Sequence, residues 1–288
     1  MLTILPRELK SYFQTATGYI FMIVYLMLFG IYFTYININP TPNNAYTVTI
    51  ENMVFIFVLL SPLLTMKALS EERKNKTDQL LLTSPKSVSA IVLGKFFAAI
   101  ILFFITLLIT TLYPIILSFF GDIYLPTIVI AYIGFFFMGC TFIGLGIFIS
   151  SLTENQLIAG VSTLGISMIL WLVEAISSRF PVDSFSGFIF LIILASALNG
   201  IVYYFSKNIW LTMSLTIICV GILCAIFYAK KSFFEGMIKR FSDWFSIPLH
   251  SKDFYLGILD FSDLIYFISL ICLFLYFTIF AIERRRWT

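Results

Sequence analysis

The chain contains few charged residues and few side chains suited to catalysis. Only 11% of its 288 residues are charged, whereas about a quarter of the residues in a soluble domain are charged. It has one histidine, and its four cysteines, Cys140, Cys219, Cys224 and Cys272, all lie in apolar runs without a C-x-x-C pair. Metal sites need ligands clustered at short spacing. We therefore expect no metal site, and we expect the cysteines to be buried small apolar residues.

The sequence also lacks the common motifs of nucleotide hydrolysis and proteolysis. No G-x-x-x-x-G-K-[ST] and no H-E-x-x-H occurs, so the chain cannot hold ATP in a P-loop. Charges within the apolar runs are too few for an ion-coupled carrier with a buried proton relay. The net charge of +3 gives no indication of nucleic-acid binding. We expect a chain that is not an enzyme and has no cofactor of its own.

Apolar side chains dominate instead: 60% of residues are hydrophobic, and the mean hydropathy is +1.00. About twenty apolar residues in a helix cross the hydrocarbon core, which is ~30 Å thick. The sequence therefore predicts an all-α polytopic membrane protein in which residues 1–288 form a single transmembrane domain. Eight spans are predicted, at approximately residues 18–38, 52–69, 91–119, 126–150, 157–177, 187–205, 209–229 and 262–282.

Two segments have the amphipathic pattern of helices that lie in the membrane interface. In residues 1–17, apolar side chains recur at three- and four-residue steps, while Arg7, Glu8 and Lys10 occupy the other face. Residues 230–260 combine aromatic and basic side chains at similar spacing until Pro248. We expect the first helix at the cytosolic surface and the second group at the external surface.

The distribution of basic residues predicts the orientation. Six of the 18 basic residues lie in residues 67–95, between two apolar runs, and three more form Arg284–Arg286. Short basic loops stay on the cytoplasmic side. We therefore expect a multi-pass protein of the cytoplasmic membrane with both termini in the cytoplasm. Five basic residues within 230–252 run against this rule if that segment is external.

The basic loop has a helical pattern of its own. Ser70 can cap a helix, and Glu71 and Glu72 fall in its first turn, where carboxylates meet the positive end of the helix dipole. An apolar edge follows at Leu80–Leu82, before Ser84-Pro85 breaks the helix. Such a helix could dock a soluble partner or serve only as a solvated connector, and the pattern alone favours neither.

Small residues in the fourth predicted span favour close packing of helices. Gly139, Cys140 and Gly144 lie close together there, and Cys140 and Gly144 are four residues apart. Small residues at this spacing let two helix backbones approach each other. We favour packing within one subunit over a dimer interface.

Three pieces of the sequence together resemble a known family. The run Ser70–Lys74, continued by Thr77–Pro85, is similar to the cytosolic loop of ABC-2-type transporter permeases. The loop Ser150–Gln156 and the terminal Glu283–Trp287 are similar to later pieces of its gliding-motility-type branch. The resemblance implies a type V exporter-like transmembrane domain with a six-span core, two extra spans and an N-terminal interfacial helix that touches the ATPase.

The resemblance also implies a function. The chain would be the permease subunit of an ATP-binding cassette transporter that exports or extracts a substrate. A separate cytosolic ATPase would bind ATP and Mg²⁺, and a second permease copy or paralogue would complete a dimer. The alternative is a non-transporting membrane scaffold or sensor of a motility or signalling complex. Stable co-purification with a Walker-type ATPase would favour the transporter.

Within this interpretation, the first loop carries the coupling helix. The expected ATPase-coupling residues are Ser70, Glu71, Glu72, Arg73, Asp78, Leu80, Leu81 and Leu82. The acidic side chains and Arg73 would pair with opposite charges on the ATPase, and the leucines would anchor the helix. The second loop, with Thr153, Glu154, Asn155 and Gln156, is expected to form a turn in which Thr153 caps the fifth span. We expect Glu154 and Asn155 to matter less for ATPase association than the first loop.

Overall fold

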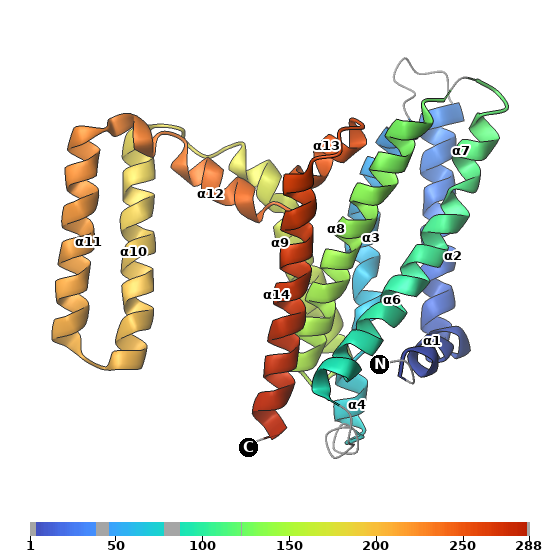
Figure 1. The fold of residues 1–288 in the computed structure, drawn as a ribbon, viewed down its shortest axis with the longest axis horizontal. Helices are drawn as coiled ribbons and strands as arrows, with labels where there is room; N and C mark the ends of the chain where they lie inside the picture. Colours follow the sequence, from blue (N-terminus) through green and yellow to red (C-terminus); the bar gives the residue numbers. More distant parts are fainter. Residues whose placement is uncertain (1–3, 39–45, 78–86, 122, 287–288) are drawn as a thin grey trace. The chain divides into compact units, whose positions relative to one another are not determined.

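The computed structural model describes residues 4–38, 46–77, 87–121 and 123–286. Within these ranges all regular structure is helical (Figure 1), which confirms the all-α prediction. The helices are α1 (Ile4–Gln14), α2 (Ala16–Phe33), η1 (Thr34–Ile38), α3 (Tyr46–Thr65), α4 (Ser70–Lys74), α6 (Val88–Thr110), α7 (Leu112–Leu117), α8 (Leu125–Leu152), α9 (Gln156–Ser177), α10 (Ser184–Ser206), α11 (Ile209–Ala229), η2 (Lys231–Phe234), α12 (Met237–Phe245), η3 (Leu249–Ser251), α13 (Lys252–Tyr255) and α14 (Phe261–Arg286).

Seven helical segments in the described residues are long and apolar enough to cross a membrane. They are Ala16–Ile38, Tyr46–Lys74, Val88–Leu117, Leu125–Leu152, Gln156–Ser177, Ile209–Ala229 and Phe261–Arg285. A shorter apolar helical segment, Ser184–Gly200, lies within α10. The chain is therefore a multi-pass membrane protein. An eighth span through α10 and an interfacial position for α1 remain predictions.

The second span starts earlier than the sequence suggested. Helix α3 begins at Tyr46 instead of near residue 52, because the polar side chains of its first turns have partners inside the protein. The hydroxyl groups of Tyr46 and Tyr132 are 2.7 Å apart, and Thr49 donates a hydrogen bond of 2.6 Å to Asn37. Hydropathy alone could not show these buried polar contacts.

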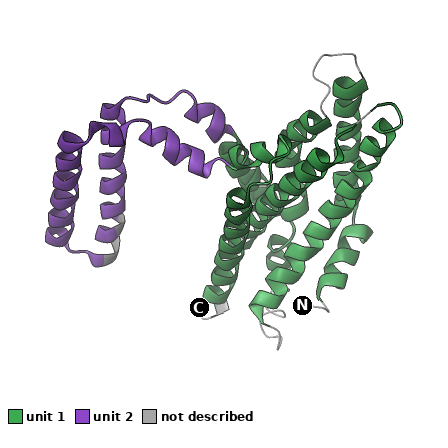
Figure 2. Cartoon of the chain, turned by 45° about the horizontal axis from the view of Figure 1, so that its top comes forward, with its two compact units in different colours: residues 1–171, 247–288 green, residues 172–246 purple. Residues whose placement is uncertain are grey.

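The chain divides into two compact units (Figure 2): unit 1 comprises residues 1–171 and 247–288, and unit 2 comprises residues 172–246. That both belong to a single transmembrane domain remains a prediction. In unit 2, α10 and α11 form a hairpin in which the rings of Phe188 and Phe227 lie 4.7 Å apart. Asp183 caps α10 and Asn208 caps α11 through their side-chain oxygens.

Helix α8 is the centre of unit 1 and packs against α3, α6, α13 and α14. The ring centre of Phe135, on α8, lies 5.9 Å from the ring centre of Phe57 on α3 and 6.0 Å from that of Phe103 on α6. Gly139, one turn further along α8, lets Phe103 approach the helix backbone. A Cβ atom at Gly139 would be only 2.4 Å from that ring, whereas a Cβ atom at Gly144 would be in ordinary contact at 3.7 Å.

The cysteines differ in burial. Cys140 is buried beside Gly139, as expected, and Cys219 and Cys224 are half-buried. The expectation was wrong for Cys272, which is exposed on α14. An apolar run in a membrane protein supplies residues both to the protein interior and to the outer face of the helix, and composition does not separate the two.

The two ends of α8 mark the two ends of unit 1 (Figure 1). Near its start, Gly257 approaches Thr127, and Phe254 approaches Gly134. Near its end, Ser150 accepts hydrogen bonds from the beginning of α4. Thr127 and Ser150 are separated by about 35 Å along a helix, which exceeds the ~30 Å hydrocarbon thickness. We call the end that holds α4 the foot of unit 1.

This arrangement yields a labelling test of the predicted topology. We replace the four cysteines and introduce a single Leu256→Cys or Asn75→Cys change at positions exposed at opposite ends of unit 1. Ser251, otherwise an obvious reporter in this segment, is fully buried. With the foot in the cytoplasm, a membrane-impermeant thiol reagent should label the Leu256→Cys variant on intact cells and the Asn75→Cys variant only after permeabilisation. The reverse pattern would overturn the predicted orientation.

The glycine contacts on α8 yield a second test. Gly139→Ala forces a methyl group against Phe103, and overpacking of this kind costs about 1–3 kcal/mol. We expect a lower thermal unfolding midpoint for the purified full-length protein in detergent. Gly144→Ala, with the same change of residue type on the same helix, should leave the midpoint nearly unaltered. A larger loss in Gly144→Ala would contradict the packing described here.

Candidate functional site

The first turn of α4 is anchored to α8. The backbone N–H groups of Leu69 and Ser70 each donate a hydrogen bond of 3.1 Å to Ser150 Oγ. Ser150 Oγ also donates to the carbonyl oxygen of Met66 at 3.3 Å. Ser70 and Ser150 are fully buried. A single side chain of α8 thus pairs two amide groups that the start of a helix leaves without partners in the helix itself.

The predicted capping role of Ser70 was wrong. Leu69 occupies the position before the helix, and Ser70 is the first residue of α4. The Ser70 hydroxyl donates backwards to the Met66 carbonyl, because the chain between α3 and α4 continues in tight turns that keep this carbonyl within reach. Ser150, which is 80 residues away in sequence, supplies the acceptor that the cap would have provided.

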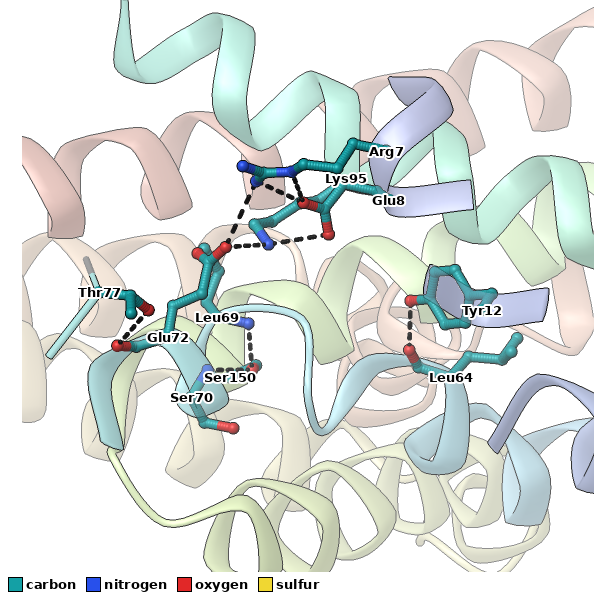
Figure 3. A network of polar contacts seen from close by, with 10 residues as sticks. All are labelled: Arg7, Glu8, Tyr12, Leu64, Leu69, Ser70, Glu72, Thr77, Lys95 and Ser150. Atoms are coloured by element: carbon teal, nitrogen blue, oxygen red, sulfur yellow. Dashed lines mark hydrogen bonds and ion pairs between the residues drawn. The ribbon is translucent and has the colours of Figure 1, made fainter. Parts of the chain in front are cut away.

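Four charged side chains meet beside α4 (Figure 3), and we call them the Lys95 cluster: Arg7, Glu8, Glu72 and Lys95. Lys95 Nζ lies 2.8 Å from Glu72 Oε1 and 3.1 Å from Glu8 Oε2. Arg7 lies 2.7 Å from Glu8 and 3.8 Å from Glu72. The cluster joins α1, α4 and α6 through ion pairs and has no net charge.

Lys95 lies about two turns into α6, and its side chain is only 3% exposed. A buried ammonium group is very costly unless it is paired and hydrogen-bonded. The side chains of Glu8 and Glu72, which are 16% and 19% exposed, provide that pairing. The ion pairs are therefore a condition for α6 to pack at the foot, and they also fix the positions of α1 and α4.

Glu8 lies outside the membrane-spanning segments. Burial alone would raise the pKa of its carboxyl group. The charge of Lys95 and hydrogen bonds from Arg7 and Lys95 outweigh that effect and hold the pKa of Glu8 below its ordinary value. A lowered carboxyl pKa stabilises the fold at neutral pH, and this contribution is lost as the pH falls through the lowered pKa. At neutral pH, the ionised Glu8 therefore helps to hold α1 on α6.

A second ion pair joins α4 to the loop that follows α8. Arg73 Nη2 lies 2.7 Å from Glu154 Oε1, so the second loop, which was expected to matter less for ATPase association, is in contact with the first. Arg285, at the end of α14, donates a hydrogen bond of 2.7 Å to the carbonyl oxygen of Ser151. The first loop, the second loop and the C-terminal basic run therefore meet at the foot of unit 1.

The second loop caps α9 differently from the prediction. Asn155 precedes α9, which begins at Gln156, and its side-chain oxygen accepts a hydrogen bond of 2.9 Å from the Leu157 N–H. Thr153 is extended, and its hydroxyl oxygen accepts a hydrogen bond of 3.2 Å from the Asn155 N–H. The turn exists as expected, but Asn155 caps the helix and Thr153 supports Asn155.

The coupling residues predicted from the sequence thus fall into three groups. Ser70, Glu72 and Arg73 make side-chain contacts within the chain. Glu71 is half-buried, and its side chain makes no ion pair with the described residues. The remaining four lie outside the described residues, so the apolar anchor remains a prediction: Asp78, Leu80, Leu81 and Leu82.

Sequence reasoning missed three residues that hold the site together. Glu8 was treated as part of the polar face of α1, Lys95 as a member of the basic loop, and Ser150 as a loop residue. A signal existed for Lys95, because it lies within an otherwise apolar stretch from residue 88 to residue 110, where a charge needs a partner. Nothing in the sequence identifies Glu8 or Ser150 as a partner.

Removing Lys95 tests the cluster. Lys95→Met leaves Glu8 and Glu72 without their shared cation, and removing one partner of a buried ion pair costs roughly 3–5 kcal/mol. We expect a clearly lower thermal unfolding midpoint for the purified full-length protein. Lys74→Met, at an exposed position of α4, is the matched control and should change the midpoint little. Equal midpoints in the two variants would refute the structural role of Lys95.

The amino-acid sequence matches a known family. No curated protein matches the chain. Residues 33–205, more than half of the chain, match the family described as ABC-2 family transporter protein. The match includes α4 with its loop and also α8 and α9; membership of the gliding-motility-type branch remains a prediction. The chain therefore belongs to the ABC-2 transporter family.

Proposed function

We propose that the chain is the membrane-spanning permease subunit of an ATP-binding cassette transporter that exports or extracts a substrate. In this proposal a separate ATPase chain binds ATP and Mg²⁺, and a second permease copy or paralogue completes the transporter. Family membership supports a role in membrane transport. The residues that would receive force from the ATPase are those of the predicted coupling segment, Ser70–Leu82. The prediction of a continuous helix over this segment was wrong, because α4 ends at Lys74 and Lys76 in the following turn has a left-handed backbone, with φ 57°.

The observation that carries this proposal is the number of elements to which α4 is linked. Glu72 joins it to α6 and α1, Ser150 joins it to α8, and Arg73 joins it to the loop before α9. Packed elements connected in this way move together as a rigid body more readily than they deform. A displacement of α4 would therefore be transmitted to several membrane helices of unit 1 at once.

The contacts within the chain restrict which residues can meet the ATPase. Glu72 and Arg73 are used internally, so reversing the charge of Glu72 would place a cation against Lys95 and disturb folding. Lys74 is exposed at the end of α4, and Asn75 and Lys76 are exposed in the turn that follows it. We propose that this basic tip contacts acidic side chains of the ATPase, while the leucines that follow provide the apolar anchor.

A non-transporting scaffold or sensor is the alternative function. It would retain the same membrane helices and the same basic foot, but it would not need a nucleotide-driven partner. Isolation of the chain from native membranes in mild detergent separates the two proposals. Recovery with a Walker-type ATPase supports the transporter, and consistent recovery without one supports the scaffold.

Charge reversal at the basic tip tests the coupling proposal. The double variant Lys74→Glu/Lys76→Glu leaves the Lys95 cluster and the Arg73–Glu154 pair intact. We expect it to insert and fold normally but to lose most of the co-purifying ATPase and its ATP hydrolysis. Individual exposed charges contribute only ~0.2–1 kcal/mol, so single reversals should have small effects.

The matched control is Lys230→Glu/Lys239→Glu, which makes the same change in net charge at exposed positions of unit 2. This control should retain ATPase association. If the α4 double variant kept normal association and turnover, the basic tip would have no role in coupling. Equal losses in both double variants would indicate a general effect of charge.

A further inference from the structure

A groove of about 700 Å³ opens at the foot between α1 and the segment from the end of α3 to α4. Its volume lies within the usual range of ligand sites. Hydroxyl groups of Ser11 and Thr15 line the side of α1, and Lys67 and Glu71 line the opposite side. The Lys95 cluster also lines the groove, so this site has walls that are fixed by ion pairs.

The basic and acidic side chains that line the groove are equal in number, but two of them make no ion pair with the described residues. Arg7, Lys67 and Lys95 are basic, and Glu8, Glu71 and Glu72 are acidic. The four members of the Lys95 cluster neutralise one another through the distances given above. In the part of the chain that the structure describes, Lys67 and Glu71 make no ion pair. The groove therefore offers one cation and one anion to a ligand, together with hydroxyl donors.

We propose that this groove binds the phosphoethanolamine head group of a membrane phospholipid. The phosphate would be held by Lys67 and the hydroxyl groups of α1, and the primary ammonium group would donate hydrogen bonds to Glu71. Hydrogen bonds between charged groups are the stronger ones, and head groups are recognised by such pairing at the bilayer surface. The amphipathic α1, which forms one wall, has the pattern of a helix that lies at this depth.

The same chemistry disfavours the other common head groups. A phosphatidylglycerol head group can place its phosphate on Lys67 but has no cation for Glu71, so that carboxylate would stay unpaired. A phosphatidylcholine head group has a cation without N–H donors, so it cannot form a hydrogen bond with the Glu71 carboxylate. The groove should therefore select a zwitterion with a primary amine. This site is separate from the basic tip proposed to contact the ATPase.

Lipid retention by the full-length protein tests the proposal. The purified chain in detergent is incubated with equal amounts of phosphatidylethanolamine, phosphatidylglycerol and phosphatidylcholine of identical acyl chains, and the retained lipids are counted by native mass spectrometry. We expect phosphatidylethanolamine to be retained preferentially. Losing one hydrogen bond to a charged group should weaken its retention roughly tenfold, in both Lys67→Gln and Glu71→Gln.

Lys74→Gln, on the exposed part of α4, is the control and should retain the wild-type preference. Equal retention of the three lipids by the wild-type protein, or a preference for phosphatidylglycerol, would by itself overturn the proposal. Unchanged retention in folded Lys67→Gln and Glu71→Gln would show that the lipid binds elsewhere. If an equal concentration of soluble glycerophosphoethanolamine displaced the lipid, the groove would be a site for a free metabolite. The proposal that its ligand is a membrane phospholipid would then be wrong. Because no ATPase is present, these outcomes are independent of the coupling test.

Discussion

The burial of one ammonium group determines how the foot of unit 1 is built. Lys95 enters the protein on α6, where a charge without partners would prevent packing. Its two carboxylate partners come from α1 and α4, so satisfying one charge places three segments. The hydrogen bonds of Ser150 and the Arg73–Glu154 pair then extend this arrangement to α8 and the next loop.

If α4 receives force from an ATPase, as proposed, its polar contacts have a mechanical advantage. Apolar packing is not directional and allows helices to slide, whereas ion pairs and hydrogen bonds hold particular atoms at particular distances. Helix α4 has only five residues, too few to be stable without tertiary contacts. Its geometry is therefore set by its neighbours, and a change in its position must be shared with them.

Sequence reasoning predicted the helices well because long apolar runs and basic loops are strong local signals. The α4 loop and the turn at residues 153–156 were also identified from local pattern. The partners of these residues were not, because Glu8 with Lys95 and Ser150 with Ser70 are separated by 80 or more residues, and no local rule selects among the available side chains. The capping prediction for Ser70 failed for the same reason, since Ser150 supplies the acceptor. The Thr153 prediction failed for a local reason, because α9 begins at Gln156 and Asn155, directly before it, is the cap.

The contacts at the foot also have an order in time, since a membrane protein is synthesised from its N-terminus. All members of the Lys95 cluster lie within the first 95 residues, so this cluster can assemble before the last helices of the chain have been made. Ser150 and Glu154 arrive later, and the hydrogen bond from Arg285 to Ser151 must await the last helix. The contact made by α14 is therefore added last to an arrangement that α1, α4 and α6 began. A chain truncated before α14 would retain the Lys95 cluster but lack the hydrogen bond from Arg285 to Ser151.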